Sequence, residues 1–294
     1  MKCYYNGEIT NIEDVTVSPL SFSLHYAVCA FEGIRSYEVE EGHCSAIFRL
    51  DRHADRLVNS CLGIGMNGVF CNKTIIERSV IETVKSNGGG NLYIRPIFYY
   101  GSGIMSVRKH GDLNFLVIAL PVENAELNKS KSLVFSDRPR DISTIDAKIS
   151  RNYFDSYMAV HLSDCDLESE VLQFTTDGFV TETSAHNIFF QFESGEYATP
   201  SKEYCLEGIT RDTVLEIAKN IDLIVSERAI QKEELKSVRS CFLTSTAGEI
   251  ITIRDIQGVA ISIDSKLLAE SVRVYSVLTR EGRDVYQKGW LNYV

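Results

Sequence analysis

A polar stretch without a clear hydrophobic period, at residues 123–131, divides this chain into two halves that each mix helical and strand patterns. Two β-prone runs, at 92–100 and 115–122, precede it. A segment of this composition is typical of a connection between domains. We therefore predict a small N-terminal α/β domain at 1–122, a linker at 123–131, and a larger C-terminal domain at 132–294 that carries Lys148. Both halves fit an α+β or α/β architecture.

The first half predicts short strands followed by two helices. Asn6-Gly7 is a hairpin signal, and residues 35–48 predict two strands around a turn at Glu41-Gly42. A helical period begins at Asp51, and a second one covers residues 75–84. We expect the strands of this half to pair antiparallel.

The second half alternates strands with helices. Strands are predicted at residues 131–136, 170–176, 187–192 and 241–244. Helices are predicted at residues 152–162, 211–220 and 265–280, with Thr210 as the N-cap of the second. No internal repeat interrupts this order.

Composition excludes several classes of function. The chain has 294 residues, 44% of them hydrophobic, and a formal net charge of -10 with scattered basic residues, so we expect neither a nucleic-acid nor a membrane partner. The eight cysteines include no C-x-x-C pair, and no histidine cluster has metal-ligand spacing, so we expect reduced thiols and no metal. The N-terminus lacks an apolar signal core, which predicts a cytoplasmic protein.

Lys148 is the candidate nucleophile, because it stands where an apolar segment gives way to an amphipathic helix. A fixed lysine amine can form a Schiff base with a carbonyl compound such as pyridoxal phosphate. A solvent-exposed loop lysine would explain the same nonapeptide.

Three segments could anchor a phosphate. Gly208-Ile-Thr-Arg-Asp212 opens a helix whose free N–H groups favour an anion. Thr244-Ser-Thr-Ala-Gly-Glu249 follows a strand with hydroxyls and small residues. Arg49 stands between a strand and a helix, where a guanidinium could fork onto phosphate oxygens. A capped helix, a simple turn and a surface ion pair would explain these segments as well.

Two further positions suit an amino-acid substrate. Glu182 follows a short strand, and a buried carboxylate there could keep a pyridine nitrogen protonated. Tyr93 and Arg95 lie two apart on one predicted strand, so they share a face and could bind a carboxylate. An exposed glutamate and a rim ion pair are the structural alternatives.

Taken in order, these segments resemble the class IV, fold-type IV pyridoxal-phosphate aminotransferases, and most closely the branched-chain amino-acid aminotransferases. The residues that carry the resemblance are Leu24-His-Tyr-Ala27, Phe31-Glu-Gly-Ile-Arg35, Phe48-Arg49, Tyr93-Ile-Arg-Pro96, Lys148 with Asn152-Tyr153, Glu182 with Asn187, Gly208-Ile-Thr-Arg-Asp212 and Thr246-Ala-Gly-Glu-Ile250.

The resemblance implies a role for each cofactor residue. Lys148 would be the Schiff-base lysine and proton shuttle, Glu182 would contact the pyridinium nitrogen, and Tyr153 would neighbour the ring oxygen. The implied phosphate contacts are Arg49, Ile209, Thr210 and Thr246.

The resemblance also implies a substrate site and a reaction. Tyr93 and the backbone at Thr246-Ala247 would hold the substrate carboxylate, Arg95 the distal carboxylate of glutamate or 2-oxoglutarate, and Phe31 with Gly33 the side chain. The implied activity is ping-pong transamination between a branched-chain or other hydrophobic L-amino acid and 2-oxoglutarate, through a Lys148 aldimine. A homodimer, or a higher homo-oligomer, is implied too.

This chain departs from the family pattern near the proposed site. Ser150 and Arg151 replace two glycines, His186 replaces an acidic residue and Glu207 replaces a proline, while the loop at 101–106 also differs. These departures leave open another class IV activity, D-amino-acid transamination or aminodeoxychorismate lysis. A cofactor-free binding protein of the same fold is the alternative from a different class.

Overall fold

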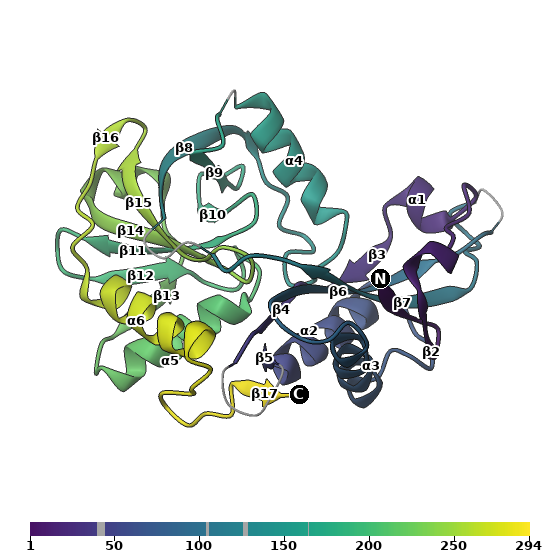
Figure 1. Cartoon of the computed structure of the whole chain (residues 1–294). Coiled ribbons are helices and arrows are strands. Elements are labelled where there is room, and N and C mark those ends of the chain that lie inside the picture. The colour runs from purple at the N-terminus through teal and green to yellow at the C-terminus, as the bar shows by residue number, and fades with distance from the viewer. Residues whose placement is uncertain (40–44, 104–105, 126–128, 164) are drawn as a thin grey trace. The chain divides into compact units, whose positions relative to one another are not determined.

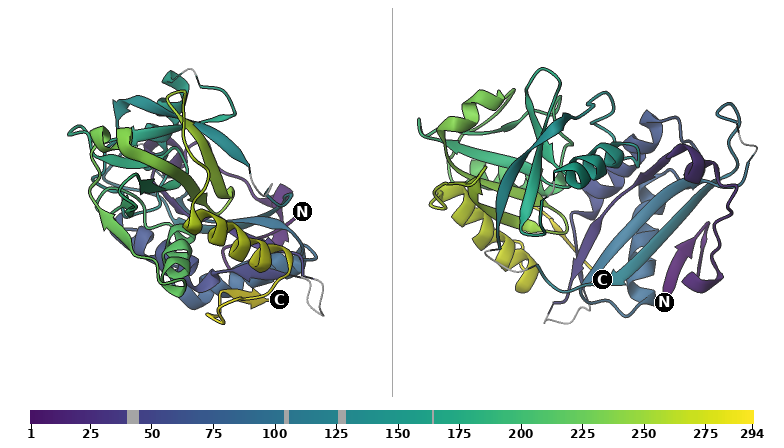
Figure 2. Two further views of the ribbon diagram at one scale, coloured as in Figure 1. Left: turned by 90° about the vertical axis from the view of Figure 1, so that its left-hand side faces the viewer. Right: turned by 90° about the horizontal axis from the view of Figure 1, so that it is seen from above.

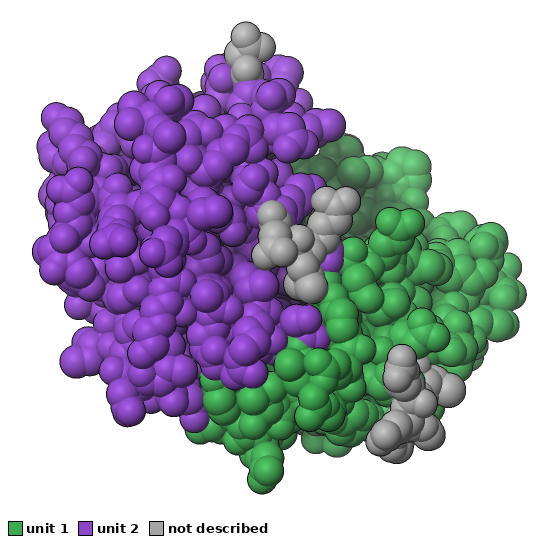
Figure 3. Space-filling view, turned by 60° about the vertical axis from the view of Figure 1, so that its left-hand side comes forward, with its two compact units in different colours: residues 1–124, 147–151, 277–294 green, residues 125–146, 152–276 purple. Residues whose placement is uncertain are grey.

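The computed structural model describes residues 1–39, 45–103, 106–125, 129–163 and 165–294. Its chain forms two compact units, coloured separately in Figure 3. Unit 1 comprises Met1–Asn124, Ala147–Arg151 and Val277–Val294, and unit 2 comprises Ala125–Asp146 and Asn152–Ser276. Lys148 thus belongs to unit 1. A compact unit need not fold independently, so the predicted domain boundaries at 122 and 131 stay predictions.

Unit 1 is built on an antiparallel sheet (Figure 1). Its strands are β1 (Lys2–Tyr5), β2 (Glu8–Asn11), β3 (Cys29–Phe31), β4 (Ile34–Tyr37), β5 (Ala46–Phe48), β6 (Leu92–Tyr100), β7 (Leu113–Pro121) and β17 (Leu291–Tyr293). The path through the sheet is β17-β5-β4-β6-β7-β1-β2, with β3 paired to β6. The predicted hairpin at Asn6-Gly7 is confirmed, and both its residues have positive φ. The predicted turn at Glu41-Gly42 lies outside the described residues.

The helices of unit 1 are η1 (Ile12–Asp14), α1 (Phe22–Tyr26), α2 (Leu50–Gly63) and α3 (Lys73–Ser86). Helices α2 and α3 pack on one face of this sheet (Figure 2), whereas Ile12 of η1 packs with Tyr99 and Leu116 on the other. On α2 the buried residues recur at helical spacing, from Leu50 through Ala54 and Leu57 to Cys61. They pack with alternate residues of β6, Ile94 and Phe98, because side chains on a strand point to opposite faces.

Unit 2 contains a mixed sheet in the path β10-β9-β8-β15-β14-β11-β12-β13, with β16 on β15. Its strands are β8 (Ser130–Pro139), β9 (Ser169–Phe174), β10 (Val180–Thr183), β11 (Asn187–Phe192), β12 (Tyr197–Pro200), β13 (Val225–Arg228), β14 (Val238–Ser245), β15 (Glu249–Ile256) and β16 (Val259–Ala260). β8 runs parallel to both of its neighbours, and most other pairs are antiparallel. The expectation of sheets and helices in both halves is confirmed.

The remaining helices are α4 (Asn152–Leu162), α5 (Ile209–Asn220), η2 (Lys232–Ser237) and α6 (Lys266–Arg280). The predicted helix at 152–162 is confirmed at both ends. The predicted N-cap Thr210 is wrong: the cap is Gly208, and α5 begins at Ile209. Gly208 has the extended backbone of an N-cap residue, so Thr210 lies inside the first turn of α5, where it is buried. Within the described residues, no helix is long and apolar enough to cross a membrane.

Candidate active site

Lys148 is fixed in unit 1 through its backbone. Its N–H donates to Ser60 Oγ on α2 at 2.9 Å, and its carbonyl accepts the N–H of Phe31 at 3.1 Å. The next residue, Ile149, forms an antiparallel bridge with Ala30 on β3. The half-buried side chain places Nζ 5.4 Å from the centroid of the Phe31 ring. A lysine held on both sides of its backbone has a defined direction for its amine, as a nucleophile needs.

The structure brings four predicted substrate residues together on the same sheet. Arg95 donates from Nη2 to the Tyr93 hydroxyl at 2.7 Å, and its guanidinium carbon lies 4.5 Å from the centroid of the Phe31 ring. Gly33 packs against the Tyr93 hydroxyl so closely that a Cβ would overlap it. Phe31 therefore contacts both Arg95 and Lys148, which joins the predicted catalytic and substrate groups of unit 1.

Arg49 occupies a different place in unit 1. It adopts the left-handed conformation, with φ of 49°, directly before α2. Its N–H donates to the carbonyl of Trp290 at 2.7 Å, and its guanidinium carbon lies 5.5 Å from the centroid of that indole. The structure thus describes Arg49 as packed on Trp290. Its phosphate contact stays a prediction.

Sequence reasoning missed a buried cluster behind Phe31, formed by Glu32, His53 and Arg56. The Glu32 carboxylate lies 2.8 Å from His53 Nδ1 and 2.6 Å from Arg56 Nε. His53 and Arg56 are three residues apart on α2, so they share a helix face. The sequence signals that could have predicted this cluster are the spacing of His53 and Arg56 and the position of Glu32 between two apolar strands.

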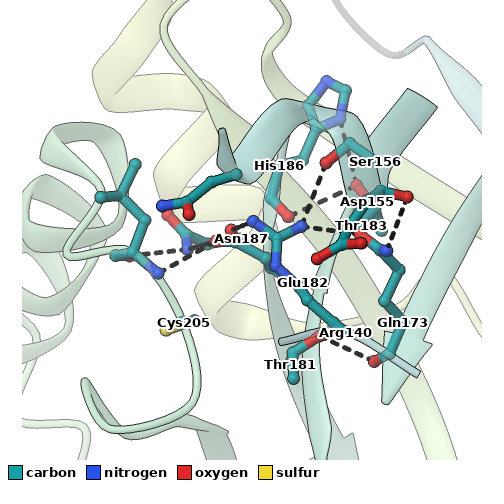
Figure 4. A network of polar contacts seen from close by, with 12 residues as sticks. Arg140, Asp155, Ser156, Gln173, Thr181, Glu182, Thr183, His186, Asn187 and Cys205 are labelled. Carbon is teal, nitrogen blue, oxygen red and sulfur yellow. Dashed lines mark hydrogen bonds and ion pairs between the residues drawn. The ribbon is translucent and has the colours of Figure 1, made fainter. Parts of the chain in front are cut away.

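Glu182 is the centre of a polar network in unit 2 (Figure 4). Its Oε1 accepts from Arg140 Nη2 at 2.8 Å, and its Oε2 accepts from Asn187 Nδ2 at 2.9 Å and from the N–H of Leu206 at 3.1 Å. Arg140 also donates to Gln173 and Ser156. A buried carboxylate that is held by a guanidinium, an amide and a backbone N–H has a fixed position, which suits a partner for a protonated ring nitrogen.

The start of α5 adjoins this network through Asn187. Gly208 packs so closely on Asn187 Oδ1 that a Cβ there would overlap it. Ile209 and Thr210 are buried in the first turn, where backbone N–H groups have no acceptor within the helix. The helix start and Glu182 are thus brought together within unit 2.

Thr246 and Ala247 form the turn between β14 and β15. The turn is tight: Ser245 pairs with Glu249, and the N–H of Gly248 donates to Ser245 Oγ at 2.9 Å. Thr246 is half-buried and Ala247 is exposed. The contact of Thr246 and Ala247 with an anion stays a prediction.

Tyr153 lies in the first turn of α4, also in unit 2. Ser156, three residues further on this helix, accepts from Arg140 at 3.1 Å. The same helix that carries Tyr153 therefore contacts the Glu182 network. The twelve predicted site residues are divided between the two units: Arg49, Phe31, Gly33, Tyr93, Arg95 and Lys148 lie in unit 1, and the other six lie in unit 2.

His186 departs from the family pattern and has a carboxylate partner of its own. Its Nδ1 lies 3.3 Å from Glu170 Oε2, and Lys131 Nζ lies 2.6 Å from Glu170 Oε1. Burial alone would raise the pKa of Glu170, but His186 and Lys131 outweigh it and lower the pKa to about 2. His186 also packs against Gly248, so it supports the turn that carries Thr246 and Ala247.

Comparison with known proteins gives the family. Residues 29–256 match the family described as amino-transferase class IV. A branched-chain-amino-acid aminotransferase from Pseudomonas aeruginosa is 32% identical over 263 residues, which are 87% of this chain and 84% of that protein. This chain belongs to the class IV aminotransferases.

Solved structures agree with that assignment. A branched-chain aminotransferase from Thermoproteus uzoniensis, crystallised with norvaline, has a TM-score of 0.90 and 29% identity, covering 100% of this chain and 99% of that one. A branched-chain amino acid aminotransferase from T.th., complexed with N-(5'-phosphopyridoxyl)-L-glutamate, has a TM-score of 0.89 and 30% identity, covering 99% and 98% of the two chains. The predicted α/β fold of type IV is confirmed.

Proposed function

We propose that this aminotransferase uses pyridoxal 5'-phosphate to move an amino group between a branched-chain or other hydrophobic L-amino acid and 2-oxoglutarate. The observation that carries the proposal is the position of Lys148, whose backbone is held by Ser60 and Phe31 and whose amine lies beside the Phe31–Arg95–Tyr93 cluster. Relatives named as branched-chain aminotransferases support the substrate class.

The residues of this chain fit the cofactor. Glu182 offers a buried, paired carboxylate to a ring nitrogen, and α5 begins after Gly208 without a side-chain cap bond. Lys148 would bind the cofactor covalently through Nζ, and Tyr153 would neighbour its ring oxygen. Thr246, with Arg49 in the predicted role, would complete the phosphate site.

Bound pyridoxal phosphate would supply an electron sink for the electrons left at the substrate α-carbon. The Lys148 amine takes the proton from that carbon and returns it to the cofactor side, acting as a general base and then as a general acid. Glu182 would lie against the ring nitrogen, where a neighbouring carboxylate favours the protonated form of that nitrogen. These are the steps that this chain's own side chains perform.

Substrate selection rests on Arg95 and Phe31. An arginine stacked on an aromatic ring and bonded to Tyr93 keeps its remaining donors available for a distal carboxylate, as in glutamate or 2-oxoglutarate. Phe31 and Gly33 would line the space for a hydrophobic side chain. The T.th. enzyme was crystallised both with a phosphopyridoxyl glutamate and with 4-methylvaleric acid, which supports one site for acidic and branched side chains.

The decisive experiment combines absorbance with product formation. The purified protein should show the long-wavelength band of a lysine-bound cofactor, which Lys148→Ala should abolish. L-leucine with 2-oxoglutarate should then yield glutamate. Glutamate from D-alanine alone would instead favour D-amino-acid transamination, release of pyruvate from aminodeoxychorismate would favour the lyase, and absence of the band would favour a binding protein.

We further propose a homodimer in the cytoplasm. The resemblance to class IV enzymes supports the dimer, and the free thiols of the described cysteines fit a reducing compartment. Light scattering on the eluting protein measures the mass directly, against 33.0 kDa for one chain.

A further inference from the structure

Thr244 carries a buried hydroxyl near the end of β14. The residue is only 1% exposed, and within the described part of the chain its Oγ1 has no hydrogen-bond partner. A buried polar group that lacks a partner costs free energy, because folding has removed it from water. Such groups are rare in folded proteins, so this one indicates a partner that the chain alone does not supply.

The register of the sheet fixes the direction of this hydroxyl. Thr244 lies directly opposite Asn187 on β11, and two residues back along β14 Phe242 lies opposite Phe189. The Phe189 and Phe242 rings stack with their centroids 5.1 Å apart, so both pairs project from one face of the sheet. Leu243 projects from the other face, into the apolar core. Thr244 and Asn187 therefore point the same way, with Cβ atoms about 5 Å apart.

Asn187 contacts the residue at which α5 begins. Gly208, the N-cap of α5, packs so closely on Asn187 Oδ1 that a Cβ would overlap it, and α5 packs on β14. Asn187 is not a donor for this space, because its Nδ2 already bonds to Glu182 and to the carbonyl of Leu206. The Thr244 hydroxyl is therefore the group of this strand pair that is directed toward the start of α5 and still has its hydrogen to donate.

The start of α5 offers further donors. Among the described residues no side chain caps this helix, and the N–H groups of its first turn, which include those of Ile209 and Thr210, have no acceptor within the helix. These groups and the helix dipole favour an anion. A phosphate has several acceptor oxygens, so it can accept from backbone N–H groups and from a hydroxyl at the same time. The Thr244 hydroxyl and the first turn of α5 thus form one set of donors that suits a phosphate.

We propose that Thr244 is a further phosphate-binding residue, whose Oγ1 donates a hydrogen bond to a phosphate group held at the start of α5. The inference rests on the proposed function, in which that phosphate belongs to pyridoxal 5'-phosphate and Ile209, Thr210 and Thr246 are its other contacts in unit 2. The hydroxyl donates from a place closed to solvent, where a hydrogen bond to an anion is stronger than in water. The bound phosphate in turn satisfies a buried group that otherwise has no partner among the described residues.

Thr244→Val tests the contact without any turnover, because valine keeps the shape of threonine and removes only the hydroxyl. Titration of the cofactor-free protein, followed by the absorbance band, gives the affinity. We expect pyridoxal 5'-phosphate to bind about 10- to 100-fold more weakly, the usual effect of losing a hydrogen bond to a charged group. Pyridoxal, which lacks the phosphate, should bind the variant and the wild type equally. Unchanged affinity for pyridoxal 5'-phosphate overturns the inference, and so does an equal loss for pyridoxal.

The stability of the cofactor-free protein separates a binding role from a structural one. Valine replaces a buried hydroxyl that has no partner among the described residues, so Thr244→Val should unfold at the same urea concentration as the wild type or a higher one. Thr199→Val is the contrast: its hydroxyl donates to the carbonyl of Ile188 at 2.7 Å, so this variant should unfold earlier and keep its cofactor affinity. If Thr244→Val unfolds as early as Thr199→Val, its hydroxyl has a structural partner and the inference is wrong.

Ser240→Ala is the matched control on the same strand. Ser240 lies four residues before Thr244 and opposite Gln191, on the same face of the sheet. It is also 1% exposed, and its Oγ likewise has no partner among the described residues. This variant should keep the wild-type affinity for pyridoxal 5'-phosphate. A loss as large as that of Thr244→Val would show that the affinity responds to any buried hydroxyl on this face, which contradicts a specific contact.

Inorganic phosphate separates the two proposals. If the wild type gives no absorbance band with pyridoxal 5'-phosphate, the proposed function fails, and thermal unfolding in inorganic phosphate still decides the role of Thr244. A ligand of the folded state raises Tm, and Thr244→Val should reduce this rise while Ser240→Ala retains it. An equal rise in Thr244→Val and the wild type rejects the phosphate contact. If the wild type gives the band but Thr244→Val binds both probes as tightly, only the role of Thr244 fails.

Discussion

Arg140 and Glu182 form an ion pair of 2.8 Å in which the two side chains are only 5% and 9% exposed. We predict that Arg140→Met destabilises the protein by about 3 kcal/mol, because removing one partner leaves a buried, uncompensated carboxylate. Urea unfolding measures the loss. Arg78→Met is the control, since its pair with Glu82 is largely exposed and should contribute at most about 0.5 kcal/mol. Equal losses in the two variants would contradict the prediction.

Ser60→Ala removes the acceptor for the N–H of Lys148. We expect a loss of about 1–3 kcal/mol, the cost of leaving a buried donor unsatisfied, and a lower kcat because the Lys148 backbone loses one of its two fixed contacts. Ser79→Ala serves as the control: its buried hydroxyl bonds to the carbonyl of Ile75 within α3. A Ser60→Ala enzyme with wild-type kcat would show that Lys148 needs no support from α2.

Gly33→Ala should damage the substrate site without unfolding the sheet. A Cβ at Gly33 would overlap the Tyr93 hydroxyl, so Tyr93 must turn away and release Arg95. We expect KM for 2-oxoglutarate to rise by about 10-fold or more, as for a lost contact of about 1.4 kcal/mol. Gly63→Ala is the matched control, because nothing lies within 4 Å of its added Cβ at the end of α2. An unchanged KM in Gly33→Ala would count against Tyr93 and Arg95 as carboxylate ligands.

We predict that the free energy of unfolding falls in acid because Glu170 becomes protonated. Its pKa falls from 4.5 to about 2 on folding, so its contribution is complete above pH 4.5 and disappears as the pH falls toward 2. This contribution is on the order of 3 kcal/mol. Urea unfolding between pH 6 and pH 3 should therefore show a steeper decline for the wild type than for Glu170→Gln. Parallel curves would show that His186 and Lys131 do not stabilise the Glu170 carboxylate.

Gly208→Ala tests the connection between α5 and Glu182. The added Cβ would overlap Asn187 Oδ1, and a displaced Asn187 loses its bond to Glu182. We expect weaker retention of the cofactor during dialysis, measured by the absorbance band, while Gly258→Ala in an open turn of unit 2 leaves the band intact. Since Gly258 has positive φ, its alanine variant can lose stability, and the comparison is therefore made on cofactor retention alone.

Local patterns in the sequence determined most of the elements. The predicted strands at 92–100 and 187–192 and the helix at 152–162 agree with β6, β11 and α4 at both ends. The signals there are short-range: β-branched and aromatic residues in strands and apolar residues at helical spacing. The motifs around Lys148, Glu182 and Gly208 were recognisable for the same reason, since each occupies a few consecutive residues.

Only the tertiary structure decided which distant segments meet. Strand β17, near the C-terminus, pairs with β5, which lies more than 200 residues earlier. The segment at Lys148 bonds to β3 and belongs to unit 1, although the residues on both sides of it in the sequence belong to unit 2. Glu32 and His53 likewise carry no local pattern that shows them sharing a buried contact. Such pairings require the closure of long loops and the joint burial of side chains that are far apart in the sequence. Neither requirement produces a periodic pattern in the sequence. The sequence therefore predicted Lys148 as the reactive amine, whereas the folded chain alone showed that Ser60 and Phe31 fix its backbone.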